Sequence, residues 1–217
     1  MKINNSRKIL LILTILATAV LLAYFLLGVF KNNPKTESQN QKIQFELSPE
    51  VEKIIKAKAD IFRPLLQSDP VISEIKESNK KHSGITLKEI LALDDKFKSA
   101  SAGDEFIKRL SSNPAAKALI NFQDDHLAFS EIFITDKFGL NVAETNKTSD
   151  YYQADEEWWV DAYASGKGRE YHGAIEFDDS AQAEAISVYI PIIEVKTNEV
   201  IGVAKAVLSI AAIKLEL

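Results

Sequence analysis

The spacing of apolar and polar positions divides the chain into three parts. Residues 9–30 form an apolar run of 22 residues without a charged side chain. Residues 48–122 carry apolar side chains at helical spacing, and from about residue 130 the apolar period shortens to two, which is typical of strands. Helices gathered ahead of an antiparallel sheet predict an α+β domain.

The apolar run is long enough to cross a membrane. At ~1.5 Å per residue in a helix, it spans roughly the 30 Å hydrocarbon core. Lys2, Arg7 and Lys8 precede the run, and this excess of positive charge predicts a cytoplasmic N-terminus. We therefore expect the following organisation at the inner or plasma membrane: a cytoplasmic segment 1–8, a transmembrane signal anchor 9–30, a polar linker 31–47, and a periplasmic or extracellular domain 48–217.

A cleaved signal peptide is the alternative for the N-terminal run. Ala17-Thr18-Ala19 resembles a small-residue cleavage site. Residues 20–30 remain apolar after it, so cleavage would leave an apolar new terminus. The uncleaved anchor is therefore favoured.

Residues 48–122 contain several signals that mark the start of a helix. Ser48 can cap a helix that has Pro49 at its first position, and Pro70 interrupts or restarts it. Thr86 and Glu89 form a capping-box pattern. A further short helix is predicted from Asn113-Pro114 to about Phe122.

The strand part begins with a hairpin. Apolar positions alternate before and after a turn at residues 136–139. Residues 155–165 predict a short helix. Two more β-rich runs, "AEAISVYIPII" and "VIGVAKAVLSI", are joined by a turn at Thr197-Asn198, so four strands are expected in total.

The amino-acid composition excludes several classes of function. The net charge of −5 gives no footprint for nucleic acid, and the absence of cysteine excludes disulfides, thiolate metal sites and a cysteine nucleophile. His82 is expected to be solvated, His172 to lie near a pocket, and Asp124-Asp125-His126 is a weak metal candidate. No phosphate loop or metal-helix motif is present. We expect a protein without enzymatic activity, cofactor or metal.

One stretch concentrates aromatic and acidic residues. "SDYYQADEEWW", residues 149–159, holds both tryptophans of the chain. Three roles are open for it: a buried helix anchor, the aromatic wall of a ligand site, or an acidic catalytic cluster. The catalytic role is disfavoured, because no metal motif or proton-shuttling partner accompanies the stretch.

The second half of the chain resembles a known family. "EIFITDKFGLNVAETNKTSDYYQADEEWW", "IEFDDSAQAEAISVYIPII" and "EVIGVAKAVLSI" are similar to extracytoplasmic PAS-like sensor modules of the Cache or PDC type, in their single-module form. The resemblance covers about residues 48–210. It implies a long helix beside a central antiparallel sheet, and a ligand pocket between that sheet and a covering loop and short helix.

The resemblance also suggests site residues. In amino-acid-binding relatives, an Arg-x-Trp-Tyr pattern binds the ligand carboxylate and a later aspartate binds its ammonium. Here Glu156 stands at the arginine position, and Asp178, with Asp179 as the alternative, stands at the aspartate position. Acids beside aromatic faces predict a cationic ligand, such as an amine. The ligand-binding candidates are Tyr151, Tyr152, Glu156, Trp158, Trp159, Tyr171 and Asp178.

Two functions follow. The favoured one is a membrane-anchored module that senses or binds a small molecule. The sequence ends about seven residues after the last predicted strand, so we expect no output domain; signalling would use a homodimer through the helix from Ser48, or a separate membrane partner. The alternative is a structural or interaction protein of the cell envelope with a collapsed pocket. An open cavity of about 300 Å³ or more would favour the first.

Overall fold

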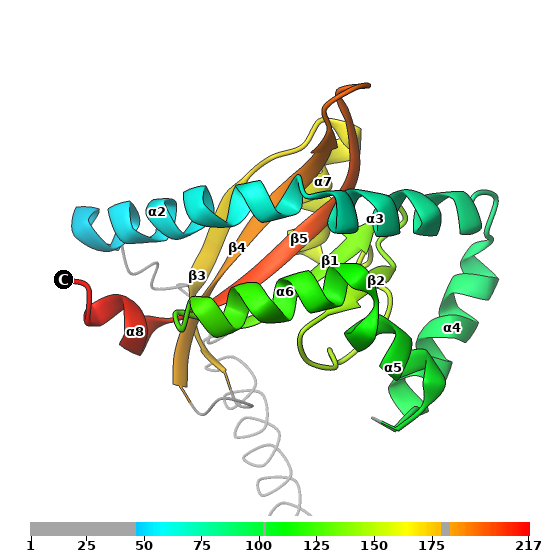
Figure 1. Cartoon of the computed structure of the whole chain (residues 1–217), viewed down its shortest axis with the longest axis horizontal. Coiled ribbons are helices and arrows are strands. Elements are labelled where there is room, and N and C mark those ends of the chain that lie inside the picture. The colour runs from blue at the N-terminus through cyan, green and yellow to red at the C-terminus, as the bar shows by residue number, and fades with distance from the viewer. Residues whose placement is uncertain (1–46, 102, 179–182) are drawn as a thin grey trace, which may run out of the picture. The chain divides into compact units, whose positions relative to one another are not determined.

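The computed structural model describes residues 47–101, 103–178 and 183–217 (Figure 1). The expected anchor 9–30 and almost all of the linker 31–47 lie outside the described residues. Within the described ranges, no helix combines the length and apolar character needed to span a membrane. The membrane topology therefore stays a prediction.

From residue 47 onward, five helices precede the sheet. They are α2 (Pro49–Leu66), α3 (Asp69–Lys81), α4 (Leu87–Ser99), α5 (Glu105–Ser112) and α6 (Pro114–Asp125). Ser48 caps α2, and both hydrogen bonds of the Thr86–Glu89 capping box are present at α4. Asn113 caps α6 as expected. The start signals were local, so they could be located from the sequence.

The sheet contains one strand more than the sequence predicted. Its strands are β1 (Phe129–Asp136), β2 (Asn141–Glu144), β3 (Tyr171–Asp178), β4 (Ala183–Glu194) and β5 (Glu199–Ser209), in the spatial order β2-β1-β5-β4-β3 and antiparallel throughout. The missed strand is β3. It is an edge strand with a glycine and several half-exposed positions, so its sequence lacks the apolar alternation that marks the other strands.

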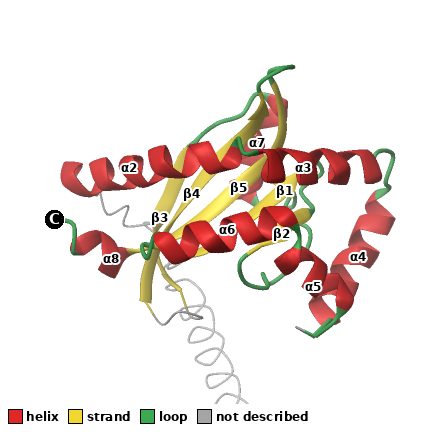
Figure 2. Ribbon diagram, in the orientation of Figure 1, coloured by secondary structure: helices red, strands yellow, loops and turns green. Residues whose placement is uncertain are grey.

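The remaining helices of the described ranges are short: α7 (Glu157–Tyr163), followed by a 3₁₀ turn (Ala164–Gly166), and α8 (Ile210–Lys214). The α+β architecture and the hairpin β1–β2 confirm the predicted fold. Figure 2 shows α2, α3 and α6 crossing one face of the sheet.

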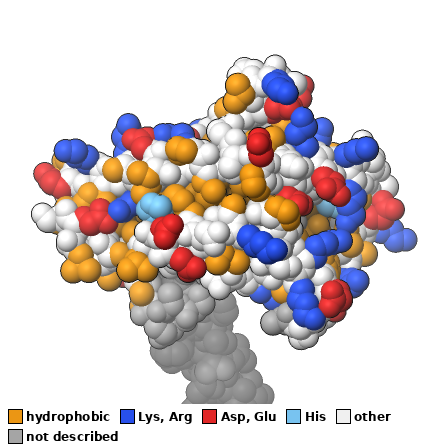
Figure 3. Space-filling model, in the orientation of Figure 1, with side chains coloured by type: hydrophobic (Ala, Val, Ile, Leu, Met, Phe, Trp, Pro, Cys, Tyr) orange, Lys and Arg blue, Asp and Glu red, His pale blue; other side chains and the backbone are white. Residues whose placement is uncertain are grey.

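The main core lies between that face and the three helices. The strands contribute small and branched aliphatic side chains, among them Ile134, Ala206 and Leu208, and the helices contribute Phe62, Ile75 and Leu119. Figure 3 views this side, where basic side chains gather toward the end that holds α4 and α5.

The turn between β1 and β2 positions the stretch that contains the predicted site. Gly139 has φ +80°, and an added Cβ would lie 2.4 Å from the Cβ of Ala154. Two backbone hydrogen bonds join the loop to the hairpin end. The Asn141 N–H donates to the Tyr151 carbonyl, and the Gln153 N–H donates to the Gly139 carbonyl. The glycine thus lets the loop run along the hairpin end.

Candidate functional site

A cavity of about 360 Å³ lies on the sheet face opposite α2, α3 and α6. The strands supply its floor and the loop after β2 supplies one wall. Its lining residues are Glu131, Phe133, Lys147, Thr148, Ser149, Gln153, Ala174, Glu176, Phe177, Ala185, Ser187, Tyr189, Lys205 and Val207. This is the place that the family resemblance implied, and its volume is above the ~300 Å³ typical of the smallest ligand sites.

Three side chains stand in a row across the cavity floor. Lys205 on β5 is directly opposite Phe133 on β1 and Tyr189 on β4. Trp158 of α7 covers this row, stacking on Tyr189 at 5.1 Å between ring centroids. The Lys205 ammonium lies 5.1 Å from the Trp158 ring centroid and 5.7 Å from that of Phe133. The chain's own lysine therefore already uses these aromatic faces.

The neighbouring tryptophan has a different role. Trp159 is buried, and its indole Nε1–H donates to the Thr135 hydroxyl at 2.8 Å. Its ring stacks on Tyr163 at 4.7 Å. The Tyr171 hydroxyl donates to the Trp158 carbonyl at 2.9 Å. These contacts fasten α7 to the sheet, so that Trp158 is held over the floor.

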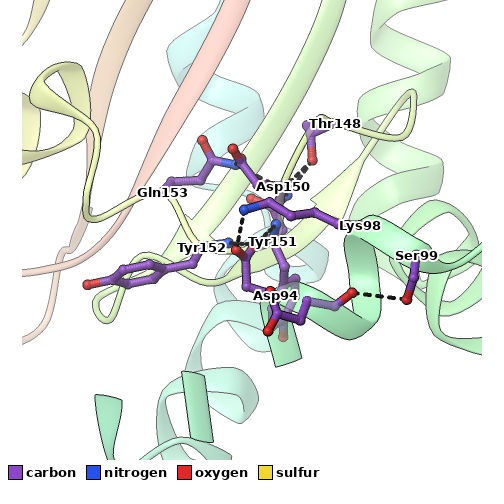
Figure 4. Close-up of polar contacts among 10 residues, drawn as sticks. Asp94, Lys98, Ser99, Thr148, Asp150, Tyr151, Tyr152 and Gln153 are labelled. Atoms are coloured by element: carbon purple, nitrogen blue, oxygen red, sulfur yellow. Dashed lines mark hydrogen bonds and ion pairs between the residues drawn. The ribbon is translucent and has the colours of Figure 1, made fainter. Parts of the chain in front are cut away.

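The loop that forms the cavity wall is attached to α4. Asp94 accepts hydrogen bonds from the backbone N–H of Tyr151 at 2.8 Å and of Tyr152 at 3.2 Å, and pairs with Lys98 (Figure 4). Burial alone would raise the pKa of the Asp94 carboxyl, but the hydrogen bonds from Lys98 and the two amides outweigh burial and lower it. An ionised carboxylate thus holds the loop.

A second carboxyl group lies behind the same wall. Glu144, at the end of β2, is fully buried, and its Oε2 lies 3.3 Å from the Thr148 hydroxyl. Asn141 Nδ2 donates to Thr148 Oγ1 at 2.7 Å. Burial raises the pKa of Glu144 to about 7, against the opposing effect of hydrogen bonds from Thr148.

The structure places the sequence-predicted residues around the cavity rather than in its lining. Tyr151 is buried against Phe97 and Phe106, and Tyr152 is half-buried beside that cluster. Glu156 is exposed at the N-cap of α7. Trp158 contacts three lining side chains, whereas Trp159 and Tyr171 secure α7.

Asp178 is the last residue of β3, and its side chain, like the whole of Asp179, lies outside the described part of the chain. Ligand contact by any of the candidates stays a prediction.

The lining residues on the strands were missed. A signal for them existed: Ser187, Tyr189 and Lys205 alternate with buried aliphatic residues in β4 and β5. Period-two alternation puts them all on the face away from the helices. A lysine inside an otherwise apolar strand was the most informative of these.

Two expectations about histidines are wrong. His82 is buried, with Nδ1 2.7 Å from Asp136 Oδ2, because it forms the C-cap of α3 and turns inward onto the β1–β2 turn. His172 directs Nε2 toward Glu52 of α2 at 3.0 Å, and is not among the residues that line the cavity. Across the described ranges, no cluster of three metal-ligating side chains occurs, the Asp124-Asp125-His126 stretch included.

No protein-family model and no curated protein matches the chain. Solved structures match at low identity. The extracellular domain of vpHK1S-Z8, assigned as a histidine kinase, has a TM-score of 0.46 and 11% identity, covering 77% of this chain and 55% of that chain. The sensor domain of the Vibrio cholerae histidine kinase DctB has a TM-score of 0.36 and 16% identity, covering 71% of this chain and 59% of that one.

The ligand-binding domain of the Pseudomonas aeruginosa amino-acid chemoreceptor PctC, solved with GABA, has a TM-score of 0.38 and 12% identity, with coverage of 67% and 61%. This chain thus spans between 55% and 61% of the length of these three structures. Two of these domains come from proteins described as histidine kinases, and the third comes from a chemoreceptor.

Proposed function

We propose that this protein is a membrane-anchored, extracytoplasmic module that binds a small molecule in the sheet-face cavity and passes the bound state to a membrane partner or a second copy. The cavity is the observation that carries the proposal. Its floor is regular sheet, its wall is a loop held by a few polar contacts, and Trp158 of α7 packs on the floor residues Phe133 and Tyr189. The proposed anchor is residues 9–30, which are mostly aliphatic and carry no charged side chain.

The charges of the cavity bear on the class of ligand. Glu131 and Glu176 contribute negative charge to the lining, and Lys147 and Lys205 contribute positive charge. The sequence predicted a cation, partly from Glu156, but that side chain is exposed at the start of α7. The Lys205 ammonium already lies over the aromatic faces that a cationic ligand would bind. A ligand with only positive charge would therefore be repelled by Lys205, because like charges repel strongly in a partly dry site. We therefore propose a ligand with a positive group toward Glu176 and an acidic group toward Lys205.

A thermal-shift screen tests this proposal. The probes are putrescine and choline as cations, GABA and glycine as zwitterions, and succinate as an acid. A ligand at 100 times its Kd adds about 2.7 kcal/mol to the free energy of unfolding, so a zwitterion at saturation should raise the melting temperature by several degrees.

Reciprocal variants assign the charges. Lys205→Met should weaken probes that carry an acidic group, and Glu176→Gln should weaken probes that carry an amine. Lys117→Met on α6 is the matched control, because Lys117 is exposed on the helix-covered side. If no probe of any charge raises the melting temperature, the cavity does not bind small molecules and the structural alternative is preferred.

A further inference from the structure

A fully buried carboxyl group stands one side chain behind the cavity. Glu144 pairs across the sheet with Phe133, which lines the floor. Its Oε2 lies 3.3 Å from the hydroxyl of Thr148, which lines the wall. Glu144 itself is not among the lining residues. It is therefore placed to act on residues 145–153 rather than on a ligand.

The hydrogen bonds of this carboxyl group are incomplete when it is ionised. Oε2 accepts from Asn141 Nδ2 at 3.4 Å and from the Thr148 hydroxyl at 3.3 Å. Oε1 has no partner within the described residues, and the same is true of Asn141 Oδ1. A carboxylate only accepts hydrogen bonds, so an ionised Glu144 leaves its own Oε1 and the Asn141 Oδ1 without a donor in a buried site. A protonated carboxyl group supplies the donor that this cluster of acceptors lacks.

The surrounding charges are mixed. Burial raises the pKa of Glu144 to about 7 and hydrogen bonds from Thr148 lower it, while Glu131 on β1 raises it and Lys147 in the loop lowers it. Tyr151 faces the group from the far end of the loop, and burial raises the pKa of its phenol. Asp150 supplies a backbone carbonyl that accepts from Asn141 and Thr148, and burial raises the pKa of its side chain. Burial and the Glu131 carboxylate thus favour the neutral form of Glu144, whereas Thr148 and Lys147 oppose it.

We propose that Glu144 is a proton-controlled latch on the cavity wall: when protonated it holds residues 145–150 against β2, and when ionised it releases them. Release follows because a buried carboxylate without a full set of donors is stabilised most simply by letting water reach it. The end of the loop stays in place, since Asp94 holds the backbone of Tyr151 and Tyr152. An effect on ligand affinity rests on the proposed function, whereas the movement of the loop does not.

Amide hydrogen exchange on the full chain in detergent micelles tests the latch. Protection of residues 145–150, corrected for the intrinsic effect of pH, should be constant below about pH 4.5, fall by about 10-fold per pH unit between pH 4.5 and 7, and be level above, because only in that range does the closed loop hold a proton that the open loop loses. In Glu144→Gln, whose side chain is neutral at every pH, the loss should disappear. Strand β5, residues 199–209, serves as the internal reference and should show no such change.

A second variant keeps the test informative if Glu144→Gln misfolds. Lys147→Met removes the opposing cation and raises the pKa of Glu144 in the closed loop, so the loss of protection should continue to higher pH before it levels. Equal pH dependence in the native chain and Glu144→Gln would overturn the latch, as would a transition that Lys147→Met leaves in place. A failed latch leaves the ligand proposal standing, and a ligand screen without a hit leaves the exchange experiment intact, so the two failures are distinguishable.

Discussion

The two faces of the sheet are built from alternate residues of the same strands, yet they differ in kind. Toward α2, α3 and α6 the strands present aliphatic side chains such as Ile134 and Ala204, which pack into one continuous core. Toward α7 they present Phe133, Tyr189 and Lys205, with space left between them. One face is closed by regular helices, and the other by a loop and a two-turn helix.

The helix-covered face stabilises the fold, whereas the cavity face can respond to a proton or a ligand. The helix-covered face gains from contiguous apolar burial, which is insensitive to pH and resists local opening. The cavity face depends on a few polar contacts, those of Asp94 with the loop backbone and of Glu144 with Thr148. Small chemical changes, such as a proton or a ligand, can therefore act on the cavity face while the core keeps the domain folded.

The largest expected difference between the two faces is the loss of stability when a buried ring is removed. Phe62 of α2 is fully buried against Phe122 and Phe129. Phe62→Ala should lower the free energy of unfolding by about 3–5 kcal/mol, because it leaves a void in packed apolar surroundings. Phe133→Ala, at the cavity floor, should lower it by less, since one side of the ring already borders open space. Urea denaturation measures both, and equal losses would contradict the division between the faces.

The next effect is the pH dependence of stability. The pKa of Glu144 in the folded state, about 7, is above its ordinary value of 4.5. Between these values the folded chain binds the proton and the unfolded chain does not. The contribution of Glu144 to stability is therefore full below pH 4.5, decreases between pH 4.5 and 7, and is level above.

The expected loss over that range is roughly 3 kcal/mol. Denaturation of Glu144→Gln at several pH values should show this slope removed. A native chain and variant with parallel pH profiles would mean that Glu144 titrates normally.

The attachment of the wall to α4 should have a smaller effect. Asp94→Ala leaves two loop amides without their acceptor, which should destabilise the domain by about 1–3 kcal/mol. Asp95→Ala is the matched control, because Asp95 is the exposed neighbour on the same helix. Denaturation of the two variants compares them directly, and an indistinguishable pair would show that α4 does not hold the loop.

The smallest effect on stability is expected at Lys205. Its ammonium lies over two rings, so Lys205→Met should cost about 0.5–2 kcal/mol of cation–π interaction, offset by the apolar contacts of methionine. The net change in melting temperature should be small. A large destabilisation in a denaturation experiment would show that Lys205 is a structural residue and not a part of the ligand site.

Prediction from the sequence succeeded where the signal was local. The caps of α2, α4 and α6, the β1–β2 turn and the β4–β5 turn are each specified within a few residues. It failed for β3, an edge strand whose formation depends on its pairing with β4. It also failed for His82, because nothing in the loop sequence shows that Asp136, 54 positions away, accepts from the imidazole.

The site was predicted in part for the same reason. Ser149 and Gln153, within residues 149–159, do line the cavity, but neither was among the ligand-binding candidates. The floor was not identified, because Phe133, Tyr189 and Lys205 come from three strands and meet only through the register of the sheet. The aromatic–acid pattern drew attention to Glu156, whereas the charges that line the cavity come largely from the strands.

The sequence by itself determined the starts of α2, α4 and α6, the α+β order and the existence of a separate apolar segment, because caps, turns and periodicity act between near neighbours. Tertiary structure alone decided which side chains share the cavity and which carboxyl groups lose their water. In the sequence Glu144 is an ordinary acid at a strand end, and it is the folding of the loop after β2 that buries it. The Lys205 ammonium lies over the Trp158 ring only because α7 packs on the sheet. Burial and electrostatic environment depend on chain segments far apart in sequence, and the folded arrangement is what brings those segments together.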